Sequence, residues 1–207
     1  MNILIIGSGG REHALAWRIA QSPRIQRVFV ARGNAGTALD DNIINVPISD
    51  ISQLINFAQS EKIAYTIVGP EAPLAEGIVD QFRAAGLKIL GPTKEAAQLE
   101  TSKDFAKSFM MRHGIPTAYA QTFTDADNAH QYIQTRGAPI VIKADGLAAG
   151  KGVVVAMTEK QAHDAVDDMF SGRAVGEAGY RVVIEDYLEG EEASFIVLVN
   201  GPQMIPL

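Results

Sequence analysis

The sequence contains no cysteine, which excludes disulfide frameworks, thiol nucleophiles and cysteine-ligated metal centres. Long apolar runs are missing as well. The apolar segment at residues 3–6 ends at Gly7, so it is too short for a signal-peptide core or a membrane span. We therefore expect a soluble, unprocessed protein of the cytoplasm with no membrane partner.

An excess of basic charge is also lacking. Lysine and arginine number 18 against 24 aspartates and glutamates, which gives a net charge of −6. Neither half of the chain is basic enough to predict a nucleic-acid surface, and nothing in the sequence predicts an oligomeric state. A phosphorylated ligand would have to be held at particular loops by local lysines, arginines and backbone N–H groups.

Residues 1–100 alternate short apolar segments with segments of helical periodicity. This alternation predicts an α/β fold with a Rossmann-like, doubly wound parallel sheet. The expected strands are residues 2–6, 27–31, 65–68 and 87–90, and the expected helices are residues 11–21, 51–60 and 74–85.

After the turn at residues 91–93 the pattern changes, and we place a domain boundary near Thr101. Residues 101–207 then form a second, α+β unit. Its expected helices are one ending at residue 113 and two more at 125–135 and 159–170; its expected strands are 140–143, 153–156, 181–185 and 193–199. The last strands lack partners that would cover their apolar faces.

The loop at residues 7–13 joins a strand to a helix, where backbone N–H groups and the helix dipole favour a phosphate. Arg11 adds a positive charge there. The loop resembles a dinucleotide fingerprint, but Glu12 stands where close helix packing wants a third glycine, and Arg32 ends the next strand in place of an acid. A plain glycine-rich turn is the alternative interpretation.

Two further loops follow strands, at residues 33–37 and 69–74. In a doubly wound sheet these loops gather at one edge with the first loop, which predicts a ligand crevice. Asn34 and Thr37 can bond a phosphate or a sugar, and Glu71 can accept from a hydroxyl or an amine. Each loop taken alone is more typical of simple turn chemistry.

Residues 142–153 combine two lysines, Lys143 and Lys151, with three glycines between two expected strands. The segment is not a Walker A loop, because Gly146 and Gly150 are too close and Gly152 replaces the Ser or Thr that would hold magnesium. It predicts a hairpin flap over a polyphosphate. Lys143, at the end of an apolar strand, needs an anionic partner, which favours a phosphate over a purely structural hairpin.

Residues 182–192 carry an apolar strand into an acidic segment that could serve adenine, ribose or a metal, or be a solvated charge cluster. Together, five runs of sequence resemble the glycinamide ribonucleotide synthetase family of ATP-grasp ligases, over its N-terminal portion. The runs are GSGGREH, GNAGTA, GPEAPL, KADGLAAGKG and LEGEEASF, beginning at residues 7, 33, 69, 143 and 188.

The resemblance implies an ATP-dependent carbon–nitrogen ligase of purine biosynthesis. ATP with Mg²⁺ or Mn²⁺ would phosphorylate glycine, and the amine of 5-phosphoribosylamine would attack the glycyl phosphate to give glycinamide ribonucleotide, ADP and phosphate. It also implies a pre-ATP-grasp domain at 1–100 and an incomplete ATP-grasp domain at 101–207, with a lid at about 120–190. The rest of the site, including its catalytic residues and metal ligands, would lie beyond Leu207, so we expect the isolated chain to be inactive.

By position in these motifs, the resemblance assigns two sets of residues. The ATP-binding set is Lys103, Lys143, Gly146, Gly150, Lys151, Gly152, Val153, Glu185, Asp186, Tyr187, Leu188 and Glu192. The substrate-binding set is Gly9, Gly10, Arg11, Asn34 and Glu71.

Two positions depart from the family pattern: Arg32 stands where proline is expected and Thr101 where glycine is expected. Three other interpretations stay open from the sequence. They are another ATP-grasp carboxylate–amine ligase, a Rossmann NAD(P)-dependent oxidoreductase, and a non-catalytic nucleotide-binding fragment.

Overall fold

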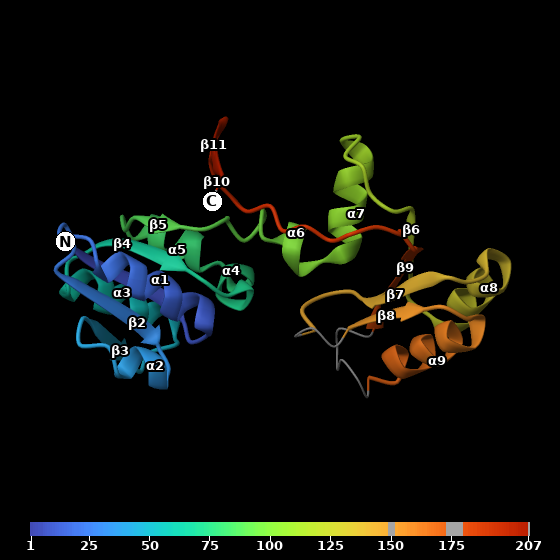
Figure 1. Ribbon diagram of the computed structural model, residues 1–207, viewed down its shortest axis with the longest axis horizontal. Coiled ribbons are helices and arrows are strands. Elements are labelled where there is room, and N and C mark those ends of the chain that lie inside the picture. The colour runs from blue at the N-terminus through green and yellow to red at the C-terminus, as the bar shows by residue number, and fades with distance from the viewer. Residues whose placement is uncertain (149–151, 173–179, 207) are drawn as a thin grey trace.

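The computed structural model describes residues 1–148, 152–172 and 180–206. Its first part is a parallel sheet of five strands in the order β3-β2-β1-β4-β5 (Figure 1). The strands are β1 (Asn2–Gly7), β2 (Arg27–Arg32), β3 (Ile43–Val46), β4 (Ile63–Val68) and β5 (Ile89–Leu90). The predicted doubly wound parallel sheet is confirmed.

Helices cover both faces of this sheet. They are α1 (Gly10–Ala20), α2 (Ala35–Ala38), α3 (Ile51–Ser60), α4 (Glu71–Glu76) and α5 (Ile78–Ala84). Successive residues of β1 point to opposite faces, so Ile3 and Ile5 pack in one core while Leu4 and Ile6 pack in the other. Burial on both faces explains why β1 is a continuous apolar run instead of an alternating one.

Several elements of the first part differ from the sequence-based expectation, among them the short helix α2, which was not predicted. Strand β3 was not predicted, because only Ile43 and Val46 of its four residues are buried. The expected helix at 74–85 is two helices, since Gly77 adopts φ 86° between α4 and α5 and ends the first of them. The expected strand at 87–90 is reduced to Ile89 and Leu90.

The second part is built on an antiparallel sheet in the order β6-β9-β7-β8. Its elements in chain order are α6 (Gln98–Thr101), α7 (Lys103–Arg112), β6 (Ala120–Phe123), α8 (Ala126–Arg136), β7 (Ile140–Ala144), β8 (Val153–Ala156), α9 (Glu159–Phe170) and β9 (Val182–Asp186). Helices α8 and α9 pack on one face through a single apolar cluster, and α7 lies on the opposite side of the sheet (Figure 1).

The chain continues into a hairpin of β10 (Val197–Asn200) and β11 (Gln203–Pro206), which pair with each other. The expected strand at 193–199 was therefore placed too early, since β10 begins at Val197. Phe195, Ile196 and Ile205 are largely exposed on this segment. Of the helices in the described part of the chain, none has the length and apolar character needed to cross a bilayer.

Candidate functional site

Glu12 lies inside the crevice at the carboxyl ends of β1 and β4. Its Oε2 accepts a hydrogen bond of 2.6 Å from the N–H of Gly9, the residue that precedes α1, so Glu12 reaches back to cap its own helix. A Cβ on Gly69 would stand 2.0 Å from Glu12 Oε1, and one on Gly7 would stand 2.5 Å from Glu12 Cγ. The glycines flanking this crevice therefore make room for a buried carboxylate, which accounts for the acid at the position of the dinucleotide fingerprint's third glycine.

Arg11 joins the first loop to the third. Its guanidinium donates a 2.9 Å hydrogen bond to the carbonyl oxygen of Gly69 and lies 3.5 Å from a carboxylate oxygen of Glu71. The Arg11 side chain remains 64% exposed, so it can still reach a ligand. Because the ion pair is exposed, it contributes little stability and can be exchanged for a phosphate contact.

Asn34 joins the first loop to the second. Its side-chain amide donates to the carbonyl oxygens of Ser8 and Gly9 at 3.1 and 3.3 Å, and its Oδ1 caps α2 by accepting from the N–H of Thr37 at 3.0 Å. Behind it, the buried Thr37 hydroxyl donates to Asn45 at 2.7 Å. Asn34 is thus fixed by the protein, and its amide N–H groups are already in use.

The three loops predicted to meet do meet. Beside them lies a cavity of about 510 Å³, lined by Ile6, Gly7, Ser8, Gly9, Glu12, Ala31, Arg32, Ile48, Ser49, Leu54, Pro70, Ala72, Pro73 and Glu76. Arg32, the departure from the family's proline, borders this cavity and follows a cis peptide bond. Arg11, Asn34 and Glu71 connect the loops outside the cavity lining.

In the second part, Asp145 anchors the beginning of α7. Its Oδ1 accepts from the backbone N–H groups of Lys103 and Asp104 at 2.6 and 3.3 Å, and its Oδ2 accepts from the hydroxyl of Ser102 at 3.3 Å. A carboxylate at a helix N-terminus satisfies free N–H groups and matches the helix dipole. Asp145 thereby fixes the start of the glycine-rich loop to the helix that carries Lys103. Thr101, which stands where the family is expected to have glycine, is the last residue of α6 and directly precedes Ser102.

Glu185 lies on the face of the sheet that looks toward α7 and is 5% exposed. One of its carboxylate oxygens pairs with Lys143 of β7 and the other with Lys107 of α7. The two strands are antiparallel with Lys143 opposite Val183 and Val141 opposite Glu185, which places all four residues on one face. The anionic partner that Lys143 was predicted to need is therefore a protein carboxylate, so that need by itself does not indicate a phosphate.

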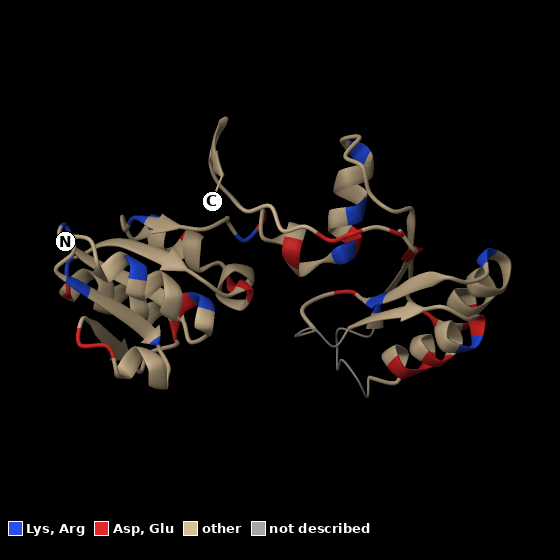
Figure 2. Cartoon of the chain, viewed as in Figure 1, with Lys and Arg blue, Asp and Glu red and all other residues tan. Residues whose placement is uncertain are grey.

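Positive charge is concentrated around this carboxylate. Burial lowers the pKa of Lys143, and the neighbouring charges of Lys107 and Lys103 lower it further. Burial also lowers the pKa of Lys107, against an opposing effect of Asp186. Figure 2 shows lysine and arginine along α7 and on β7, whereas acidic residues line α9 on the other side of the sheet. An anion approaching between α7 and the sheet would meet an excess of positive charge.

Lys103 connects α7 to the glycine-rich loop, since its ammonium donates a 2.9 Å hydrogen bond to the carbonyl oxygen of Gly146. A cavity of about 280 Å³ lies at this point. It is lined by Glu71, Glu100, Lys103, Gly146, Leu147, Ala148, Gly152 and Val153. Members of the predicted substrate set and of the predicted ATP set therefore share one cavity, which lies between the two sheets.

The remaining predicted ATP residues follow β9. Asp186 ends the strand and binds Arg136 of α8 through both carboxylate oxygens, at 2.6 and 2.7 Å. Tyr187, Leu188 and Glu192 are exposed beyond it. Gly150 and Lys151 lie outside the described residues. Among the residues that are described, no cluster of three or more histidine, aspartate or glutamate side chains is arranged to hold a metal ion.

Sequence reasoning missed Glu12, Lys107 and Asp145 as organising residues. The spacing of Gly9 and Glu12 matches a capping box, which was a usable signal. Asp145 was inside the predicted flap but unassigned, and Lys107 lies one helical turn beyond Lys103, on the same side of α7.

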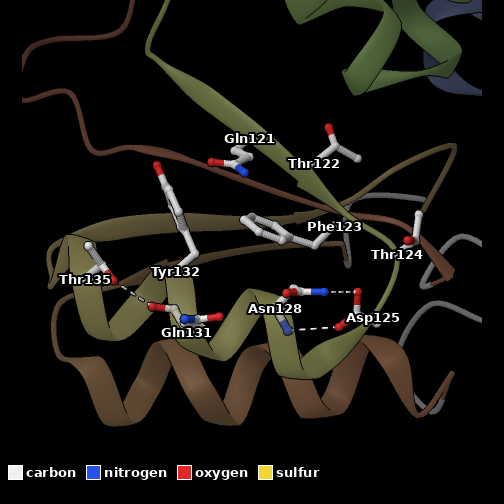
Figure 3. A pocket seen from close by; sticks show the side chains of 9 residues that line it. All are labelled: Gln121, Thr122, Phe123, Thr124, Asp125, Asn128, Gln131, Tyr132 and Thr135. Carbon is white, nitrogen blue, oxygen red and sulfur yellow. Dashed lines mark hydrogen bonds between the residues drawn. The ribbon is translucent and has the colours of Figure 1, made fainter.

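The structure also contains a shallow polar groove of about 480 Å³ between β6 and α8 (Figure 3). Asp125 caps α8 by accepting from the backbone N–H and the side-chain amide of Asn128, and the hydroxyl of Thr135 donates to the backbone carbonyl oxygen of Gln131.

A parallel sheet with a polar crevice is followed by an antiparallel sheet that presents lysines and a glycine-rich hairpin, which is the arrangement expected of an ATP-grasp protein. Two family models match, the phosphoribosylglycinamide synthetase N domain over residues 1–100 and the ATP-grasp (A) domain of the same synthetase over residues 101–207. The chain belongs to the phosphoribosylglycinamide synthetase family.

Individual relatives agree. The chain is 63% identical over 207 residues to a phosphoribosylamine–glycine ligase of Neisseria meningitidis serogroup B, covering 100% of this chain and 49% of the relative. A crystal structure of the phosphoribosylamine–glycine ligase from Thermotoga maritima superposes with a TM-score of 0.82 at 31% identity, again over 100% of this chain and 49% of the other. The chain thus spans about half the length of the relatives it matches.

The fold is shared more widely. A biotin carboxylase domain of Hydrogenobacter thermophilus 2-oxoglutarate carboxylase, crystallised with MgADP and bicarbonate, superposes with a TM-score of 0.70 at 16% identity. This likeness covers 91% of this chain and 44% of that one, and it shows a common fold alone.

Proposed function

We propose that the protein catalyses the ATP-dependent ligation of glycine to 5-phosphoribosylamine, giving glycinamide ribonucleotide, ADP and phosphate in purine biosynthesis. The curated relatives that share 62–64% of the sequence carry the name of that activity. The observation that carries the proposal is the cavity where Glu71 of the first part meets Lys103 and the glycine-rich loop of the second. There an amine substrate and a triphosphate can be brought together.

The triphosphate would lie between α7 and the antiparallel sheet. Lys103 and Lys143 would hold its phosphates, and the glycine-rich loop would close above them. The adenine would lie against the segment that follows β9, from Glu185 to Leu188, and its ribose near Glu192. The excess of positive charge around Glu185 supports this placement, because the overall charge of −6 does not attract an anion.

The phosphate of 5-phosphoribosylamine would lie at the crevice of the parallel sheet. Arg11 offers an exposed guanidinium there, and the N–H of Gly10 lies at the N-terminus of α1. Gly9 has its N–H engaged by Glu12, and Asn34 has its amide engaged by two carbonyl oxygens. We therefore assign Gly9 and Asn34 to shaping the pocket and Arg11, Gly10 and Glu71 to contacting the substrate.

The chemical logic follows from the reactivity of a carboxylate. It is a poor electrophile, so phosphorylation of glycine supplies a leaving group, and a closed glycine-rich loop protects the glycyl phosphate from water. Magnesium or manganese neutralises phosphate charge when bound. No ligand for that metal is assigned among the described residues. We also propose that the protein is cytoplasmic. The proposed domain boundary lies near Thr101, and the proposed lid comprises residues of about 120–190.

A chimera tests the function directly. Residues 1–207 are fused in place of the matching half of the Neisseria meningitidis ligase, and ADP release is measured with and without each substrate. We expect ADP release that requires both glycine and 5-phosphoribosylamine, and loss of most of it in Lys143→Met but not in Lys160→Met, an exposed lysine on α9. ADP release that ignores 5-phosphoribosylamine would reject the proposed substrate. The isolated chain, tested beside it, should give no ligation.

A further inference from the structure

The carboxylate of Glu185 has a lysine on each of its two oxygens, and the two lysines are held differently. Lys107 is 13% exposed and makes two more bonds, to the hydroxyl of Thr117 at 2.8 Å and to the carbonyl oxygen of Ala118 at 3.2 Å. Lys143 is 27% exposed. Within the described part of the chain, Glu185 is its sole hydrogen-bonding or ion-pairing partner. Lys107 is therefore fixed in place, whereas Lys143 can turn away from the carboxylate.

A phosphate that recruits Lys143 would take one partner away from Glu185. Leaving a buried carboxylate with no positive partner is strongly unfavourable, because desolvation of the charge is then uncompensated. Lys107 lowers this cost, because the Oε2 atom of Glu185 stays paired with Lys107 after Lys143 has left. Lys107 also places a positive charge next to Lys143. Repulsion between the two lysines offsets part of the attraction between Lys143 and Glu185.

We propose that Lys107 is a positioning residue: it keeps Glu185 ionised and in place while Lys143 transfers from that carboxylate to the phosphates of the nucleotide. The transfer half of this inference rests on the proposed function, because it requires that a nucleotide binds there. The other half, that Lys107 and Lys143 share one carboxylate, concerns the chain without ligand. The two halves are tested by separate measurements.

The transfer is tested by titrating the chain with Mg-ATP by calorimetry, in two buffers that differ in ionisation enthalpy. In Lys107→Met the methionine keeps the volume of the side chain but removes its charge. Binding must then leave Glu185 unpaired or protonate it, so we expect affinity to fall about tenfold or more and binding to take up additional protons. Lys107→Arg should recover much of the affinity, and Lys107→Met with Glu185→Gln should abolish the extra proton uptake.

The shared carboxylate is tested without nucleotide, by following the ¹³Cε signal of Lys143 through a pH titration. The charge of Lys107 is one cause of the lowered pKa of Lys143, so Lys107→Met should raise that pKa, while Lys160→Met should leave it unchanged. A pKa of Lys143 that does not move in Lys107→Met overturns the inference.

The two measurements separate the ways of failing. Unchanged Mg-ATP affinity and proton uptake in Lys107→Met overturn the role of Lys107 while leaving the proposed function intact. Failure of the unchanged chain to bind Mg-ATP counts against the nucleotide site itself and removes the transfer step, while the pH titration still decides whether Lys107 shares Glu185 with Lys143.

Discussion

The two sheets build their polar sites in contrasting ways. At the parallel sheet, Glu12, Asn34 and Thr37 form hydrogen bonds to the protein backbone or to the side chain of Asn45. At the antiparallel sheet, Lys143 and Lys107 both form an ion pair with one carboxylate, that of Glu185. The first site is a rigid frame whose shape depends on glycines; the second holds ion pairs that a charged ligand can replace.

This difference predicts which substitutions reduce stability and which reduce ligand binding. Changes in the crevice of the parallel sheet should reduce the stability of the fold, because buried bonds and close packing are lost there. Changes among the lysines should reduce ligand binding with smaller effects on stability, because a second lysine remains on Glu185.

The largest effect on stability is expected for Gly69→Ala. The added Cβ would stand 2.0 Å from Glu12 Oε1 and 2.5 Å from its Cδ, so a buried side chain must move. We expect the free energy of unfolding to fall by about 3 kcal/mol in denaturant titrations. Gly10→Ala is the matched control, since nothing lies within 4 Å of its new Cβ, and it should not destabilise.

The same clash can be relieved at its other end. In a Glu12→Ala background, Gly69→Ala should cost much less, because the obstructing carboxylate is gone. Equal costs in both backgrounds would show that Glu12 does not occupy the crevice as described.

An intermediate effect is expected for Asp145→Ala. Asp145 accepts from the backbone of Lys103 and Asp104 and from the hydroxyl of Ser102, so its loss frees the first N–H groups of α7. We expect a loss of about 1–2 kcal/mol in the free energy of unfolding. Asp164→Ala, which removes an exposed i,i+4 pair with Lys160, should change it by less than about 0.5 kcal/mol. Indistinguishable results for the two aspartates would contradict the anchoring role.

The smallest effect is a pH dependence. The pKa of Lys143 is lowered from 10.5 in the folded chain, so between the lowered value and 10.5 the unfolded state binds more protons. Stability therefore rises with pH in that window. The free energy of unfolding of the wild-type chain should rise relative to that of Lys143→Met as pH increases toward 10.5. Denaturant titrations at several pH values would show it, and a wild-type advantage that shrinks over this range would mean that the sign is wrong.

The amount that the sequence could predict also differs between the two regions. The parallel sheet followed from apolar periodicity, because β1 and β2 are apolar runs that are buried along most of their length and β4 is a largely apolar run that is partly buried. The two short strands at its edges were poorly predicted, since β3 buries only two residues and β5 contains two. Gly77 gave no periodic signal for the break between α4 and α5, because its effect lies in a positive φ.

The charged site was harder to predict, since it depends on tertiary pairing. The hairpin of β7 and β8 was predicted from the glycine-rich segment and is confirmed, with Lys143 opposite Val153. Its pairing with β9 brings Glu185, 42 residues away from Lys143 in the sequence, beside it on one face, and no local pattern reports such a contact. Lys107 reaches the same carboxylate from α7, the helix that lies on that side of the sheet.

The oxidoreductase alternative is not supported, because the family models match a synthetase over the whole chain and Glu12 fills the crevice with a negative charge. The most direct measurement of the central claim is a calorimetric titration of the chain with Mg-ATP, repeated with Lys143→Met and Lys160→Met and with NAD as a second ligand. We predict Mg-ATP binding that Lys143→Met weakens at least about tenfold and Lys160→Met leaves unchanged, and no NAD binding. Equal Mg-ATP binding in all three proteins would contradict a nucleotide site built around Lys143.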